Sequence, residues 1–126
     1  MNNSVPLEIR DDFAIARLCG IVSLNEAVRL IADALATARE EKVHRLLVDA
    51  SNLSGFEPPT VVDRFYIIRE WAEVARGFAG LALVVKAEMI DPQKFGVTVG
   101  LNAGLNSNVF ASESEAIAWL LKQEPA

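Results

Sequence analysis

Five polar residues that could bind a ligand, contact a partner or accept a phosphate follow the short apolar run at 45–48. They are Asp49, Ser51, Ser54, Glu57 and Thr60. If that run is a strand of a parallel sheet, these side chains lie near its carboxyl end, where open α/β sheets usually bind ligands. Asp49 could coordinate a ligand or partner; alternatively it accepts hydrogen bonds from amides of the following turn, a common role for Asp. The hydroxyls could be phosphorylated, although each also fits a local structural role.

Two further charged residues are expected at the same sheet edge. Lys86 and Glu88 follow the wholly apolar run at 81–85, which predicts a second buried strand. Three helices are expected to begin near this edge, and helix amino termini attract anions. The edge could therefore receive an anionic group. The alternative is a solvated loop of mixed charge, whose ion pairs contribute little.

The chain offers no visible apparatus for catalysis. His44 is the only histidine, and it precedes the run at 45–48, so we expect it at the sheet end opposite to Asp49. No nucleophile is suggested beside it, as a Ser-His-Asp or Cys-His arrangement would need. The sequence has no Cys/His cluster and no GxxxxGK[ST] loop, and its carboxylates are dispersed. We predict a protein that is not an enzyme and that holds no metal or cofactor.

Composition narrows the class of protein. The 126 residues predict one domain, 1–126, and 52% are hydrophobic, which rules out a disordered chain. Net charge is −5 and the 12 basic residues are scattered, so we expect neither nucleic acid nor an acidic membrane surface as a partner. The apolar runs fall short of the roughly 20 residues of a membrane helix, which predicts no membrane insertion. The first residues show no secretory signal, and we expect a cytoplasmic protein.

Hydrophobic spacing and capping residues predict the elements that position these side chains. Ser23 followed by Glu26, and Ser112 followed by Glu115, are capping-box patterns that open helices. Strands are predicted at 7–10, 13–18, 45–48, 81–85 and 108–111, and helices begin at Ser23, Thr60, Asp91-Pro92 and Ser112, the second ending near Gly77. The order predicts an α/β fold. Its single mixed, mostly parallel sheet has about five strands, with a leading antiparallel hairpin and four helices.

The helix that follows Thr60 has an unusually wide apolar surface. Its apolar side chains form an arc of about 180°, wider than the roughly 100° that a surface helix needs. They are Val61, Phe65, Ile67, Ile68, Trp71, Ala72, Val74 and Ala75. A neighbouring helix of the same fold would explain this width, and so would a partner surface, where Trp and Tyr are favoured. Our hypothesis is that Trp71 and Tyr66 contribute to a homodimer or partner face.

Glycine recurs every fourth residue in the third predicted helix. Gly96, Gly100 and Gly104 would form one row on that helix, because residues four apart are neighbours. Each interior glycine costs about 0.5–1 kcal/mol relative to Ala, so the row needs a reason. Close approach to the sheet or to the last helix is one. The alternative is a cavity or flexible lid over a small apolar ligand.

Two segments resemble a known family. The strand and turn at 47–53 (LVDASNL) and the ending at 109–120 (VFASESEAIAWL) are similar to the SpoIIAA-like or STAS family (sulfate transporter and anti-sigma factor antagonist), in a largely uncharacterised bacterial branch. The resemblance covers nearly the whole chain and implies one sheet with helices mainly on one face. Anti-sigma antagonists of this family carry a phosphorylatable Ser in an Asp-Ser-Ser-Gly-like turn. Here Glu57-Pro58-Pro59-Thr60 spans that turn, and prolines have no hydroxyl, so the usual phosphoacceptor is missing.

We therefore predict a non-enzymatic regulatory or binding module that acts through contacts with an unidentified protein partner, or as a homodimer. The alternative is a protein that binds a small apolar ligand or lipid. The family fold resembles the core of CRAL-TRIO lipid carriers, and the glycine row could line an apolar pocket. The candidate binding residues are Asp49, Ser51, Ser54, Glu57, Thr60, Tyr66, Trp71, Lys86, Gly96 and Gly100.

Overall fold

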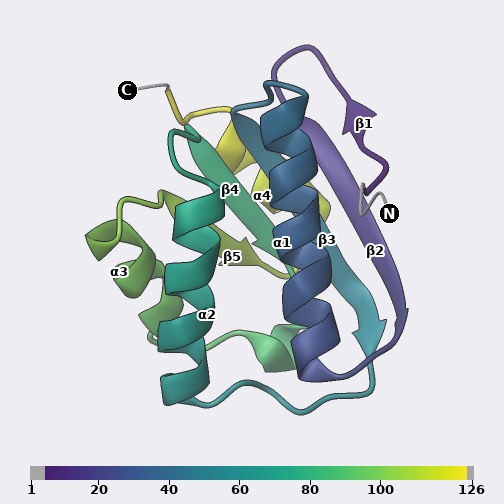
Figure 1. Ribbon diagram of the computed structural model, residues 1–126, viewed down its shortest axis with the longest axis vertical. Coiled ribbons are helices and arrows are strands. Elements are labelled where there is room, and N and C mark those ends of the chain that lie inside the picture. Colours follow the sequence, from purple (N-terminus) through teal and green to yellow (C-terminus); the bar gives the residue numbers. More distant parts are fainter. Residues whose placement is uncertain (1–4, 125–126) are drawn as a thin grey trace.

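The computed structural model describes residues 5–124 and has the predicted order of elements (Figure 1). The elements are β1 (Glu8–Ile9), β2 (Ala14–Ile21), α1 (Leu24–Glu40), β3 (Arg45–Ser54), α2 (Val61–Val74), β4 (Gly80–Val84), a 3₁₀ turn (Ala87–Met89), α3 (Phe95–Asn102), β5 (Ser107–Phe110) and α4 (Glu113–Leu120). The five strands form one sheet in the order β1-β2-β3-β4-β5. Because β1 is antiparallel to β2 and the other pairs are parallel, the predicted fold class is confirmed.

The two faces of the sheet are covered differently. Each strand pairs with the next one along the chain, and successive crossovers of one hand in one direction place their helices on the same face. Figure 1 shows α1 and α2 in front of the sheet and α4 behind it. We name the front surface, covered by α1, α2 and α3, the three-helix face, and the opposite one the α4 face. Among the described residues, no helix is long and apolar enough to cross a membrane.

Strand β3 alternates between these faces. Leu46, Val48 and Ala50 belong to the core of the three-helix face, whereas Leu47 belongs to the core of the α4 face. Strand residues alternate in this way because successive side chains point to opposite sides of a pleated sheet. Asp49 follows Leu47 by two residues and therefore points to the α4 face.

The predicted end of β3 at residue 48 is wrong, because the strand continues to Ser54. Its pairing with β4 stops at Asp49, opposite Val84, while its pairing with β2 continues to Ser54, opposite Ile21. The extra residues stay extended because β2 is also longer than predicted. Asp49 is thus the last β3 residue with a partner strand on both sides.

Side-chain caps fix the starts of three helices. Ser23 and Glu26 form the predicted capping box at α1, with bonds of 3.1 and 3.0 Å. Thr60 caps α2 as predicted. Asp63 completes a capping box there that was not predicted. At α4, Ser112 caps the amide of Glu115. The carboxylate of Glu115 accepts from the Ser112 hydroxyl instead of the backbone amide, so this predicted box is half formed.

The start of α3 differs from the prediction. The helix begins at Phe95 rather than at Pro92, because Lys94 adopts a left-handed backbone (φ 50°, ψ 47°) that interrupts the helical path. Asp91 still accepts the amide of Phe95, at 2.8 Å. At the other end, Gly104 lies beyond α3 with φ 89°, so the predicted row of three helical glycines is wrong at that position.

Candidate functional site

A cavity of about 140 Å³ lies on the three-helix face, between the sheet and the helices. Its floor is made by the strand residues Ala50, Leu81, Leu83, Ser107 and Val109, together with Val85 directly after β4. Leu83 is only partly buried although β4 has a partner strand on each side, and Val85 immediately after β4 is also partly buried. Nearly all of the lining is apolar. The cavity is therefore suited to an apolar molecule rather than to ordered water.

The walls come from α1, α2 and α3. Trp71 of α2 is only 5% exposed and lines the cavity, and its Nε1 donates to the carbonyl oxygen of Val28 on α1 at 3.2 Å. This bond satisfies the indole and joins the two helices. Trp71 therefore does not reach the outer surface, and its predicted place on a partner face is wrong. Packing between neighbouring helices, the other explanation of the wide apolar arc, accounts for this residue.

Helix α3 closes one side through a close approach to α2. A Cβ atom on Gly96 would lie 3.4 Å from Ile68, and one on Gly100 would lie 3.2 Å from the carbonyl oxygen of Leu105. Gly96 lines the cavity, and Gly100, in the same helix, is buried. Close approach thus explains Gly100, whose nearest neighbours include the hydroxyl of Ser107 in β5, so the expected approach to the sheet is confirmed there. At Gly96 the neighbour is Ile68 of α2, at an ordinary contact distance.

The charged residues of the lining come from α2 and from the segment between β4 and α3. Lys86, just after β4, donates from Nζ to the carbonyl oxygen of Leu53 at 3.2 Å. Lys94 donates from Nζ to Asn108 Oδ1 at 2.8 Å, and Arg64 of α2 approaches the carbonyl oxygen of Met89 at 3.5 Å. We name Arg64, Lys86, Asp91, Lys94 and Asn108, all of which line the cavity, the polar mouth.

The acid of the polar mouth is held by the backbone. Asp91 Oδ2 accepts the amide of Phe95 at 2.8 Å and Oδ1 accepts that of Gln93 at 3.2 Å. The pKa of Asp91 lies below its ordinary value, chiefly because of the hydrogen bond from the amide of Phe95. The amide of Gln93 and the charge of Arg64 lower it further. Asp91 is thus an ionised residue that shapes the turn before α3.

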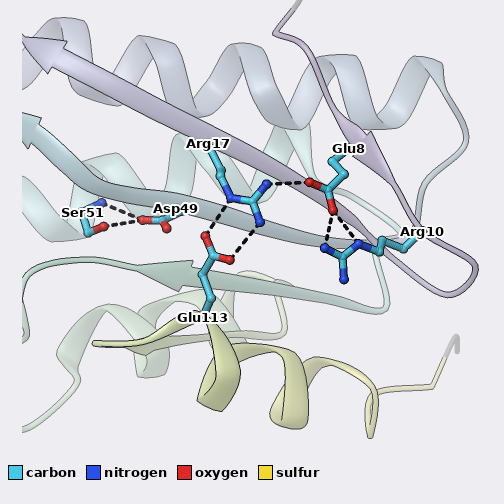
Figure 2. Close-up of polar contacts among 6 residues, drawn as sticks. All are labelled: Glu8, Arg10, Arg17, Asp49, Ser51 and Glu113. Carbon is cyan, nitrogen blue, oxygen red and sulfur yellow. Dashed lines mark hydrogen bonds and ion pairs between the residues drawn. The ribbon is translucent and has the colours of Figure 1, made fainter.

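Asp49 belongs to a separate polar network on the α4 face (Figure 2). It is 8% exposed, and one carboxylate oxygen accepts from the amide of Ser51 at 3.0 Å and from its hydroxyl at 2.6 Å. Burial opposes its charge. The hydrogen bonds from Ser51 and the charge of Arg17 favour the ionised form, so the pKa of Asp49 lies below its ordinary value. These contacts match the structural role considered for Asp49.

Arg17 joins the rest of this network. Its Nε and Nη2 each donate to a different carboxylate oxygen of Glu113 at 3.0 Å, and its Nη1 donates to Glu8 at 2.6 Å (Figure 2). Arg10 also pairs with Glu8. The hydrogen bond of Arg17 to Glu113, followed by that to Glu8, raises the pKa of Arg17. Each carboxylate shown in Figure 2 accepts at least one hydrogen bond from a neighbouring side chain or amide, so these contacts have a structural role.

The structure brings together only part of the predicted site. Trp71, Lys86 and Gly96 line the cavity. Asp49 pairs with Val84, so Asp49 and Lys86 share the expected sheet edge. Asp49 and Ser51 contact each other on the opposite face of the sheet, so Asp49 and Lys86 do not form one site.

The remaining predicted residues lie away from both groups. Thr60 is the α2 cap, and the carbonyl oxygen of Ser54 accepts the amide of Val22. Glu57 is exposed, and Tyr66 is 67% exposed with its ring 5.4 Å from that of Phe65. Neither Glu57 nor Tyr66 lines the cavity.

Sequence reasoning missed Arg64, Lys94 and Asn108. One signal could have found two of them: Arg64 and Lys94 lie in or just after the segments that follow β3 and β4, at the edge already suggested for an anionic group. Asn108 lies inside β5 and carries no such signal. Nothing in the sequence shows that their side chains turn toward the same opening.

Comparison with known proteins gives the fold. No protein-family model matches the sequence, and no curated protein matches it significantly. Among solved structures, the chain is similar to an uncharacterized protein of the DUF3478 family with a SpoIIAA-like fold from Shewanella loihica PV-4, with a TM-score of 0.50 and 15% sequence identity. The match covers 93% of this chain and 92% of that one. The fold is therefore SpoIIAA-like, as the resemblance implied.

Proposed function

We propose that this protein is a non-enzymatic binding module that takes up a small apolar molecule in the cavity of the three-helix face. The observation that carries the proposal is the cavity itself, about 140 Å³ in volume and lined almost wholly by apolar side chains. An engineered apolar cavity of about 150 Å³ in another protein stays dry and binds benzene. A small ligand would thus gain contacts at this site without displacing bound water.

The position of the cavity also supports binding. Part of its lining, including Lys86, follows the carboxyl end of β4, the usual place for ligands in open α/β sheets. Its lining combines many apolar groups with a few polar ones at one end, which is the general composition of small-molecule sites. The polar network of Asp49 lies on the other face and takes no part in this function.

The proposal is tested by titration with 1-octanol, a neutral apolar probe, followed in ¹⁵N-labelled protein by amide chemical shifts. We expect saturable shifts at residues that line the cavity. Leu83→Phe should abolish them, because the larger ring fills the space above β4. Val62→Phe is the matched control, since Val62 is 64% exposed on α2 and does not line the cavity. Absence of shifts in the wild type, or equal shifts in Leu83→Phe, would contradict the proposal.

A second candidate function is contact with a protein partner, or between two copies of the chain, through the outer face of α2. Val61, Val62 and Tyr66 are 59%, 64% and 67% exposed, an unusual amount of apolar surface for one helix. Trp71 takes no part in this candidate. Light scattering at increasing protein concentration tests self-association. A dimer mass that falls to the monomer mass in Tyr66→Glu supports it, and a monomer mass throughout removes the homodimer.

A further inference from the structure

The polar mouth carries an excess of positive charge in an otherwise acidic protein. Three of its residues are cations and one is an acid, whereas the whole chain has a net charge of −5. Asp91 uses both carboxylate oxygens for the amides of Gln93 and Phe95. Within residues 5–124, no carboxylate forms an ion pair with Arg64, Lys86 or Lys94. The cations therefore leave positive charge at the opening of an apolar cavity.

The two lysines retain hydrogen-bonding capacity. An ammonium group has three donors. In the part of the chain that the structure describes, Lys86 Nζ uses one for the carbonyl oxygen of Leu53, and Lys94 Nζ uses one for Asn108. Both side chains are partly buried, and burial of a cation is unfavourable unless it is matched by an acceptor or an anion. Lys94 Nζ also lies 5.5 Å from the centre of the Phe110 ring. An anionic group on a bound ligand would accept from the donors that remain.

The backbone of Lys94 is a second, independent observation at the same place. Lysine rarely adopts a left-handed conformation, and residues held in such regions cluster at ligand-binding sites. A glycine would fit this turn without strain. Lys42 has the same conformation (φ 61°), but it lies in the turn after α1 and does not line the cavity. The chain therefore contains its own matched control.

We infer that the ligand is an aliphatic carboxylic acid whose chain enters the cavity and whose carboxylate is bound by Lys86 and Lys94, with Arg64 beside them. This inference rests on the proposed function and adds the chemical class of the ligand. The carboxylate stays at the polar mouth, and the chain extends over Leu83 toward Trp71. The small volume selects a short or medium chain.

The test compares octanoate with 1-octanol, which share a chain length and differ in charge. Trp119→Phe serves as the background, because the chain has two tryptophans and the remaining one, Trp71, lies in the cavity wall. At pH 7 octanoate should bind about tenfold more tightly than 1-octanol, the usual advantage of a charge-assisted contact, and added salt should weaken octanoate alone.

Two glycine variants separate charge from backbone effects. Lys94→Gly should lower octanoate affinity about tenfold and leave 1-octanol affinity unchanged, because it removes the ammonium group and leaves the apolar lining in place. Lys42→Gly should leave both affinities unchanged. Thermal unfolding of each variant confirms that it is folded.

The outcomes distinguish the two proposals. If 1-octanol binds as tightly as octanoate, the carboxylate inference is overturned while the binding function stands. If neither probe binds, the binding function fails and the inference with it. An equal loss of octanoate in Lys42→Gly and Lys94→Gly overturns the assigned role of Lys94.

Discussion

The two faces of the sheet are built from alternate residues of the same strands, yet one is solid and the other is hollow. On the α4 face, Ile15, Leu47 and Ala82 are almost completely buried by a helix of only eight residues. On the three-helix face, Leu83 stays partly exposed under more helical cover. The difference teaches that side-chain volume, rather than the number of covering helices, decides whether a sheet face is filled.

The faces also differ in whether their charged side chains have partners of opposite charge. On the α4 face, the carboxylates of Glu8, Asp49 and Glu113 contact Arg10, Arg17 or Ser51, so the network is self-sufficient (Figure 2). At the polar mouth, Lys86 and Lys94 donate to neutral oxygens, and Lys94 Nζ also lies 5.5 Å from the centre of the Phe110 ring. A closed network stabilises the fold, whereas an open one suits a ligand.

The largest contrast is expected from truncation of leucine on each face. Leu47→Ala should lower the free energy of unfolding by about 2–5 kcal/mol, because it removes a fully packed side chain. Leu83→Ala should lower it by about half as much, because part of that side chain already lacks neighbours. Urea unfolding of both variants measures the difference. Equal losses would mean that the three-helix face is as well packed as the α4 face.

Enlarging the same two residues should again be tolerated better at Leu83 than at Leu47. Leu47→Phe should cost about 1–3 kcal/mol through overpacking, whereas Leu83→Phe should cost less than about 1 kcal/mol because the ring enters the cavity. Thermal and urea unfolding provide the measurement. A larger loss in Leu83→Phe would break the comparison.

Low pH should reduce the stability of the protein through Asp49, which lies on the α4 face. The lowered pKa of Asp49 contributes stability above the unfolded value near 3.9, and this contribution is lost as pH falls through the lower folded pKa. Asp49→Asn should therefore lose about 1–2 kcal/mol at pH 7 and converge on the wild type near pH 2. Urea unfolding between pH 2 and pH 7 tests this, with Ser51→Ala expected to show part of the effect. A constant difference between wild type and Asp49→Asn would argue against it.

The smallest effect concerns the two glycines of α3. Gly96→Ala should raise stability by up to about 1 kcal/mol, because alanine favours the helix and its methyl group would lie in ordinary contact with Ile68. Gly100→Ala should give no such gain, since its methyl group would lie 3.2 Å from the Leu105 carbonyl oxygen and the Ser107 hydroxyl. Thermal unfolding compares the two variants. Equal gains would show that α3 packs less closely against Leu105 and Ser107 than the structure shows.

Much of the fold could be predicted because its signals are local. The Ser23–Glu26 capping box and the apolar run at 81–85 act within one helical turn or one strand, so their outcome hardly depends on the rest of the chain. The length of β3 could not be predicted in this way. Its last residues are polar and typical of a turn, and they remain extended only because β2 pairs with them as far as Ile21.

The candidate site was predictable only in part. Lys86 was recognised because it follows a strand at the carboxyl edge, and Gly96 because of its spacing. The direction in which Asp49 points depends on strand register, and the burial of Trp71 depends on how α1 lies against α2. Such tertiary relations leave no pattern in a single sequence.

Because α4 is the last of the described elements to be synthesised, its covering of the sheet has a consequence for biogenesis. A nascent chain that has released β5 can already assemble α1, α2 and α3 on their side of the sheet. Until α4 leaves the ribosome, Ile15, Leu47 and Val84 face water, and such surfaces recruit chaperones. We expect the final helical turns to decide when the polypeptide becomes resistant to aggregation and protease.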